Sequence, residues 1–190
     1  IQIKGGELYS FHTETAPILS PRLWTPETPH LYRVESILRN KKTKAILDRS
    51  NHHTGFRWFG FDGKTGFSLN GKPYKLRGIC RHQDQKPIGV ALTDEMHRRD
   101  MMLMKEMGAN FIRISHYPQD DALLEMCDKL GMLAWEEIPI IDIMPDTPGY
   151  AENCESNLRE MIRQHYNHPS IITWGYMNEI LLVTQRRYKK

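Results

Sequence analysis

In the first third of the chain, residues that would face opposite sides of a β-strand alternate with a period of two. This alternation is clearest over residues 31–38, and the polar stretch 40–44 separates these residues from a second short apolar stretch, Ala45 to Leu47. This arrangement predicts a β-hairpin. Prolines at positions 17, 21, 26 and 29 make the preceding segment a poor helix and indicate an edge or a linker.

Two more strands are expected before the middle of the chain, around residues 55–59 and 67–69. The dipeptide Asn70-Gly71 follows the second of them and is a strong signal for a two-residue hairpin turn. A further strand is expected to leave this turn from Tyr74 onward.

After Tyr74 the hydrophobic period lengthens to that of helices, and short apolar runs separate the helices. Thr93 can cap a first helix that ends at Gly108, and Asp120 or Asp121 can start a second that ends at Gly131. A third helix is predicted from about residue 153 to 167. The apolar runs predict strands at 111–114, 132–135 and 171–177.

Strands and helices in alternation predict an α/β fold with a parallel sheet, for which two architectures compete. A doubly wound sheet normally has a glycine-rich phosphate loop after its first strand, and the segment 78–84 has none. A (β/α)₈ barrel instead gathers functional polar residues at the carboxyl ends of successive strands. Such residues follow each of the four predicted strands: Arg81, His82 and Asp84; Ser115 and His116; Glu136 and Glu137; Asn178 and Glu179.

Composition narrows the function classes. The chain has 190 residues and a formal net charge of +3, which gives no extended field for nucleic acid or anionic lipid, so neither is expected as a partner. No apolar run approaches the roughly 20 residues that span a bilayer, and a soluble globular protein is expected. The compartment stays open, and the absence of an initiator Met suggests that the native N-terminus lies elsewhere. Three widely spaced cysteines, Cys80, Cys127 and Cys154, are expected to be buried free thiols.

Two long segments resemble the signatures of glycoside hydrolase family 2. The first runs from Asn110 to Pro118 and continues through Leu123-Leu124, Asp128 and the segment 131–135; the second runs from Tyr166 to Glu179. The resemblance implies that residues 1–61 are the C-terminal part of an immunoglobulin-like β-sandwich. It also implies that residues 62–190 are the N-terminal half of a TIM-barrel catalytic domain.

Members of this family hydrolyse β-glycosides with retention, using a carboxylic acid and a nucleophilic carboxylate about 5 to 5.5 Å apart. By resemblance Glu179 is the acid/base, which must stay protonated near neutral pH, and Asn178 binds the sugar 2-hydroxyl. The family pattern also assigns His82, Asp84 and His116 to the sugar subsite. Without the signature, an Asn-Glu pair would more often cap a helix, and the histidines would be structural.

Other residues have a plain alternative to a catalytic role. Arg113 could orient the carboxylates or simply neutralise Glu136 or Glu137. His52-His53 is expected to be a surface doublet, because neighbours on a strand face opposite ways. Ile141 and Ile143 occupy the positions where some family members hold magnesium. No metal and no cofactor are therefore expected.

The length predicts an internal fragment. A (β/α)₈ barrel needs about 250 residues, and by resemblance the nucleophile lies beyond Lys190, so the isolated chain is expected to be inactive. Its last strand would be an open edge that invites pairing with another chain, including a homo-oligomer. A β-galactosidase-like specificity is preferred over a β-glucuronidase or β-mannosidase type. A non-catalytic carbohydrate-binding module and a cofactor-dependent α/β enzyme are the alternatives.

Overall fold

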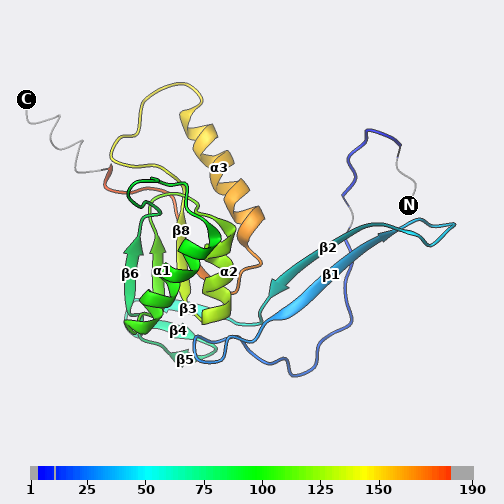
Figure 1. The fold of residues 1–190 in the computed structure, drawn as a ribbon, viewed down its shortest axis with the longest axis horizontal. Coiled ribbons are helices and arrows are strands. Elements are labelled where there is room, and N and C mark those ends of the chain that lie inside the picture. Colours follow the sequence, from blue (N-terminus) through cyan, green and yellow to red (C-terminus); the bar gives the residue numbers. More distant parts are fainter. Residues whose placement is uncertain (1–3, 11, 181–190) are drawn as a thin grey trace, which may run out of the picture.

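A long two-stranded hairpin and a four-stranded parallel sheet form the two ends of the molecule (Figure 1). The computed structural model describes residues 4–10 and 12–180. The hairpin projects away from the parallel sheet and its helices. The predicted fold class is confirmed: an N-terminal β unit is followed by an α/β half barrel.

The hairpin consists of β1 (Tyr32–Arg39) and β2 (Ile46–Thr54), which pair antiparallel. This confirms the predicted hairpin, although the second strand continues well past the short apolar stretch that indicated it. Both strands are exposed along much of their length, and Leu38 and Leu47 are among the exposed apolar residues. Local alternation and main-chain pairing therefore hold this part together more than a core of its own does.

A small antiparallel sheet links the hairpin to the barrel strands. It contains β3 (Phe59–Asp62), β4 (Gly66–Leu69) and β5 (Lys72–Pro73). Asn70 and Gly71 form the predicted turn, with φ of 51° and 77°. This left-handed geometry matches the twist of a two-residue hairpin.

Two strand predictions in this region were wrong. The strand expected at 55–59 begins only at Phe59, because the backbone before it pairs elsewhere: the Phe56 carbonyl accepts a hydrogen bond from the Trp24 N–H (2.8 Å). The Arg57 side chain donates to the carbonyls of Pro169 (3.0 Å) and Ile171 (2.7 Å). The strand expected from Tyr74 onward starts only at Gly78. In between, Tyr74 donates through its backbone N–H to Phe67.

The parallel sheet has the strand order β6-β7-β8-β9, with each strand next to its successor in the sequence. A helix connects each of the three pairs of neighbouring strands, as the alternating pattern predicts. The elements are β6 (Gly78–Arg81), α1 (Asp94–Glu106), β7 (Phe111–Ile114), α2 (Asp121–Leu130), β8 (Leu133–Glu137), α3 (Tyr150–His165) and β9 (Ile171–Gly175).

The helix boundaries follow the predicted caps at α1 and α2 and differ at α3. Thr93 accepts a hydrogen bond from the Met96 N–H, and Asp120 accepts one from the Ala122 N–H. Gly131 ends α2 in the left-handed conformation. The third helix begins three residues earlier than expected, at Tyr150, after a left-handed Gly149 that makes no side-chain cap.

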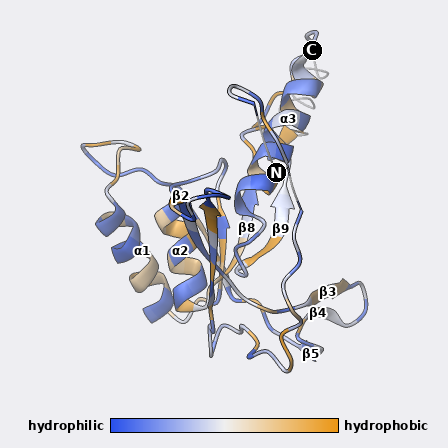
Figure 2. Ribbon diagram, turned by 90° about the vertical axis from the view of Figure 1, so that its right-hand side faces the viewer, coloured by the Kyte–Doolittle hydropathy of each residue, from blue (hydrophilic) through white to orange (hydrophobic). Residues whose placement is uncertain are grey.

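Three apolar clusters hold the half barrel together. The largest lies between the sheet and α1 and α2, which run side by side in Figure 2. A second surrounds the fully buried Trp24 at the junction with the N-terminal part, and a third lies beneath α3. Only Cys127 of the three cysteines is buried; Cys154 is partly buried and Cys80 is exposed, so the expectation of three buried thiols was wrong.

The N-terminal part contacts the end of the sheet where the parallel strands begin. The Trp24 indole N–H donates to the Asp128 carbonyl at 2.9 Å, and the Thr54 hydroxyl donates to the Asn167 carbonyl at 3.0 Å. The carboxyl ends of β6 to β9 therefore face away from this junction. Within residues 4–10 and 12–180, no helix is long and apolar enough to cross a membrane.

Candidate active site

Polar residues from all four parallel strands meet at their carboxyl ends, as the sequence predicts for a barrel. Parallel pairing in register places these ends at one edge: Cys80 pairs with Arg113, and Arg113 with Trp135. The side chains of Arg113 and Trp135 lie on the same face of the sheet, where the guanidinium lies 4.6 Å above the indole ring. This is the face opposite the one that α1 and α2 cover.

Glu137 lies at the centre of the strand-end group. Its side chain is 1% exposed, and the Arg113 guanidinium donates to both of its oxygens, from Nε to Oε2 at 3.2 Å and from Nη2 to Oε1 at 3.1 Å. His116 Nδ1 lies 2.5 Å from Oε1. Of the two partners expected for Arg113, the structure selects Glu137 rather than Glu136. Both oxygens of Glu137 are thus held by nitrogen atoms.

Asn178 connects this ion pair to Glu179. Its side-chain oxygen accepts a hydrogen bond from Arg113 Nη2 at 2.9 Å, and its amide nitrogen lies 3.4 Å from Glu179 Oε2. The backbone of Asn178 is fixed by two hydrogen bonds, to the Ile140 carbonyl (2.8 Å) and from the Asp142 N–H (3.0 Å). Asn178 is accordingly buried, while Glu179 is exposed and adopts a φ of 55°. A glutamate with its backbone in the left-handed region is uncommon, and such conformations cluster at functional sites.

The two histidines predicted for the subsite lie together, but Asp84 does not join them. The rings of His82 and His116 make an edge-to-face contact with centroids 5.0 Å apart. His82 is exposed and His116 is partly buried. Asp84 is exposed on the loop after β6, and in the described part of the chain it makes no hydrogen bond or ion pair. The strand ends therefore bring together four of the five predicted site residues through a chain of contacts.

One strand-end residue points away from this group. Arg81 is buried on the helix side, where it donates to Asp100 (Nη2, 2.7 Å) and to Gln119 (Nη1, 2.6 Å). Its register partner on β7 is Ile114, which belongs to the apolar cluster under the helices. Side chains alternate between the two faces of a strand, so Arg81 lies on the same face as Ile79, which packs under the helices. The sequence could have shown this, because Ile79 is apolar and two residues earlier. Arg81 helps to hold β6 against α1 and does not face the site.

Glu136, beside Glu137, also faces the helices. It is fully buried, and both of its oxygens lie within hydrogen-bond distance of His165 Nδ1 on α3, at 2.8 and 3.0 Å. His165 Nε2 lies 3.4 Å from the exposed Asp121 carboxylate. Burial by itself would lower the pKa of His165, but the hydrogen bond and charge of Glu136, helped by Asp121, outweigh it, so the pKa is raised.

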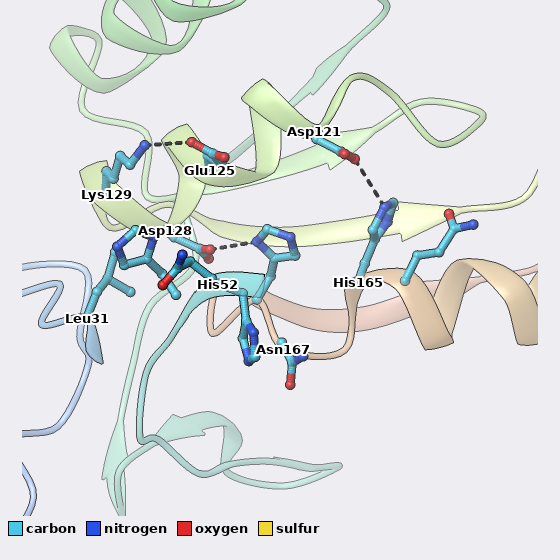
Figure 3. A pocket seen from close by; sticks show the side chains of 12 residues that line it. Leu31, His52, Asp121, Glu125, Asp128, Lys129, His165 and Asn167 are labelled. Atoms are coloured by element: carbon cyan, nitrogen blue, oxygen red, sulfur yellow. Dashed lines mark hydrogen bonds and ion pairs between the residues drawn. The ribbon is translucent and has the colours of Figure 1, made fainter. Parts of the chain in front are cut away.

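A cavity of about 520 Å³ opens beside this second group, between β2, α2 and the end of α3 (Figure 3). Asp128 holds His168 there, with Oδ2 2.6 Å from Nδ1, and it also accepts the Ser170 N–H at 3.1 Å. His52 and His53 both line the cavity, where His52 is partly buried and His53 is exposed. Among the described residues, no group of three or more His, Cys, Asp or Glu side chains is placed to hold a metal ion. The cavity lies at the junction with the N-terminal part, away from Glu179.

Comparison with known proteins identifies the class to which this fold and site belong. The profile described as "Glycosyl hydrolases family 2, TIM barrel domain" matches residues 63–189, and the profile described as "Glycosyl hydrolases family 2" matches residues 3–57. The chain belongs to glycosyl hydrolases family 2. The family resemblance seen in the sequence is thereby confirmed.

Relatives with known names are β-glucuronidases and β-galactosidases. The chain is 43% identical to a β-glucuronidase of Bacteroides fragilis over 177 residues, which cover 88% of this chain and 25% of that protein. It is 40% identical to a β-galactosidase of Thermoanaerobacter pseudethanolicus over 164 residues, which cover 85% of this chain and 22% of that protein. The crystal structure of a Bacteroides uniformis β-glucuronidase is 82% identical, has a TM-score of 0.95, and is matched by 100% of this chain over 23% of its own length. The chain thus spans about a quarter or less of these relatives.

Proposed function

We propose that this chain supplies the acid/base half of the active site of a retaining β-glycosidase. The observation that carries the proposal is the contact chain from Glu137 through Arg113 and Asn178 to Glu179 at the carboxyl ends of β7, β8 and β9. An exposed carboxylic acid beside a fixed amide suits protonation of a glycosidic oxygen. We further propose that residues 1–61 belong to the sandwich domain and residues 62–190 to the catalytic domain.

Each residue then has a role in the reaction. Glu179 protonates the leaving oxygen in the first step and activates water in the second, which its exposure allows. Asn178 donates to the sugar 2-hydroxyl. His82, His116 and Asp84 bind other hydroxyls of the sugar, for which neutral donors and acceptors suffice.

Glu137 is a poor candidate for the nucleophile. Its side chain is 1% exposed and both oxygens are bound by Arg113 and His116, so attack on an anomeric carbon would break these contacts. We therefore propose that the nucleophile comes from another part of the complete protein, outside the residues described.

The identity of the sugar that the complete protein hydrolyses is a separate proposal. Identity of 82% to a protein named β-glucuronidase supports a β-glucuronide as the substrate of the complete protein. The β-galactoside preference expected from the sequence has support from relatives named β-galactosidase at 40% identity. A common panel of substrates decides between the two.

The test uses nitrophenyl β-glucuronide, β-galactoside and β-mannoside. The complete protein is expected to hydrolyse one of them with retention, which NMR of the first-formed anomer detects. For the matching alkyl β-glycoside, whose leaving group needs a proton, Glu179→Gln is expected to lower kcat/KM by about 10²- to 10⁴-fold. The 190-residue chain alone is expected to give no turnover. Turnover by the chain alone that Glu179→Gln abolishes, or an inactive complete protein, would refute the proposal.

A carbohydrate-binding module without catalysis is the second candidate, favoured by the proximity of His82 and His116. Calorimetry that detects sugar binding to a complete protein without hydrolysis would support it. Homo-oligomer formation through the outer strands β6 and β9 also stays a proposal, which sedimentation of the purified chain tests. The expectation that no metal or cofactor is needed is tested by activity after dialysis against EDTA.

A further inference from the structure

Glu137 is a buried acid in contact with residues next to the proposed acid/base, and the proposed mechanism gives it no role of its own. Its side chain is 1% exposed, whereas its partners Arg113 and His116 have side chains that are 21% and 18% exposed. A buried carboxylate is stable only when it is paired. Glu137 has that pairing from two side chains at once, and both of them reach toward proposed substrate-binding residues.

Arg113 is shared between the carboxylate and the amide. Its Nη2 lies 3.1 Å from each Glu137 oxygen, 2.9 Å from Asn178 Oδ1 and 3.4 Å from His116 Nδ1. The bidentate contact with Glu137 fixes the plane of the guanidinium, and that plane sets the direction of the bond to Asn178. Since Asn178 accepts through its oxygen, its NH₂ group is turned toward Glu179.

The charge of Arg113 also matters for Glu179. Without a compensating carboxylate, a guanidinium one side chain away from Glu179 would favour the ionised acid, which cannot donate a proton. Glu137 supplies that compensation. Two charged or titratable groups contact Glu137 directly, Arg113 on β7 and His116 on the loop after it. Behind them, His82 contacts His116 and Glu179 lies beside Asn178, whereas Glu136 and His165 lie on the opposite face of the sheet.

We propose that Glu137 is a positioning residue for the acid/base pair: it locks Arg113 so that Asn178 is oriented toward Glu179, and its carboxylate balances the positive charge of Arg113. This inference rests on the proposed glycosidase function. It predicts two separate effects of removing the carboxylate, one on geometry and one on charge.

The experiment measures kcat and kcat/KM against pH for the complete protein and three variants. Glu137→Gln keeps the size of the side chain but removes its charge, and it is expected to lower kcat by at least tenfold and to move the alkaline limb of the kcat/KM profile down by about one pH unit. The matched control is Glu136→Gln, the neighbouring buried acid on the other face, which is expected to leave the alkaline limb in place.

The third variant, Arg113→Lys, separates geometry from charge. It keeps the positive charge opposite Glu137 but lacks the planar fork, so kcat is expected to fall about tenfold while the alkaline limb stays where it is. This variant also keeps the inference testable if Glu137→Gln does not fold, because an unchanged kcat in Arg113→Lys would refute the positioning role.

The outcomes distinguish the inference from the function on which it rests. An active wild type whose alkaline limb is unmoved in Glu137→Gln, or is moved as much in Glu136→Gln, would overturn the inference and leave the glycosidase proposal standing. A complete protein that hydrolyses no β-glycoside would overturn the proposed function itself.

Discussion

Glu136 and Glu137 are neighbours on β8, both nearly inaccessible to solvent, and their surroundings differ completely. Glu136 faces α3 and pairs with one histidine, while Glu137 faces the open side of the half barrel and pairs with Arg113 and His116. One acid contributes to the packing of a helix against the sheet. The other belongs to the group that ends at Glu179.

The difference follows from the two-residue period of a strand, which puts adjacent side chains on opposite faces. In a barrel one face is covered by helices and the other lines the interior. A pair of identical residues can therefore divide a structural and a proposed functional role between them. Four tests, from the largest expected effect to the smallest, probe the two acids and the regions of the fold beside them.

Alanine at each of the two positions tests the comparison most strongly. Glu136→Ala removes the partner of a buried histidine and is expected to lower the free energy of unfolding by about 3–5 kcal/mol. Glu137→Ala is expected to be milder, because the side chains of Arg113 and His116 are 21% and 18% exposed and can be hydrated when they lose the carboxylate. Urea unfolding of both variants measures the difference. A larger loss at position 137 would mean that the inward face carries more of the stability than the outward face.

Gly131 tests the contact between α2 and the Pro26 segment, and Gly149, before α3, is its left-handed control. Gly149→Ala is expected to cost about 1 kcal/mol, because φ is 79° and a new Cβ would meet no atom within 4 Å. Gly131→Ala has the same backbone strain, at φ 67°, and its Cβ would stand 2.2 Å from the Pro26 carbonyl oxygen. Thermal unfolding should therefore show a clearly larger loss for Gly131→Ala, and equal losses would indicate that the Pro26 segment moves away freely.

The pH dependence of the melting temperature tests the pairing of Glu136 with His165. The raised pKa of His165 means that the folded chain binds its proton more tightly than the unfolded chain does. This contribution is complete below the unfolded pKa of about 6.5 and is lost as pH rises through the higher folded pKa. The melting temperature of the wild type is expected to fall over that window relative to Glu136→Gln. A constant difference between the two proteins across this range would contradict the assignment.

The smallest effect is expected at the exposed pair on α2. Lys129 Nζ lies 2.6 Å from Glu125 Oε2, and the two side chains are 49% and 56% exposed. The hydrogen bond from Lys129 lowers the pKa of Glu125. Solvent screening limits such a pair, and Glu125→Gln is expected to change stability by about 0.5 kcal/mol or less. A loss of several kcal/mol in the free energy of unfolding would show that the carboxylate of Glu125 stabilises the residues around the cavity.

The sequence predicted the helix ends and the hairpin turn, because these depend on residues close together in the sequence. Thr93, Asp120 and Gly131 are caps whose effect depends on the nearest turn of helix, and each acts as expected. The turn at Asn70-Gly71 is of the same kind. The strand expected at 55–59 begins late because the backbone of Phe56 pairs with that of Trp24, and no local pattern contains that contact.

The sequence pointed to four residues that the strand ends bring together, but also to Asp84, which stays apart, and it did not predict how the four are connected. The strand ends and the family signatures pointed to Glu179, Asn178, His82 and His116, and the strand order brings their elements together. The choice of Glu137 over Glu136 as the partner of Arg113 follows from the register of β7 and β8, which the sequence alone does not give. The pairing of His165 with Glu136 likewise depends on where α3 crosses the sheet, so a tertiary contact decides it.

The dependence on leaving group tests the role of Glu179 most directly. With Glu179→Ala in the complete protein, we expect a large loss of kcat/KM for substrates whose leaving group needs a proton and a much smaller loss for activated nitrophenyl glycosides. An equal loss for both kinds of substrate would contradict the acid role, and with it the reading of the Asn178–Glu179 pair at the end of β9.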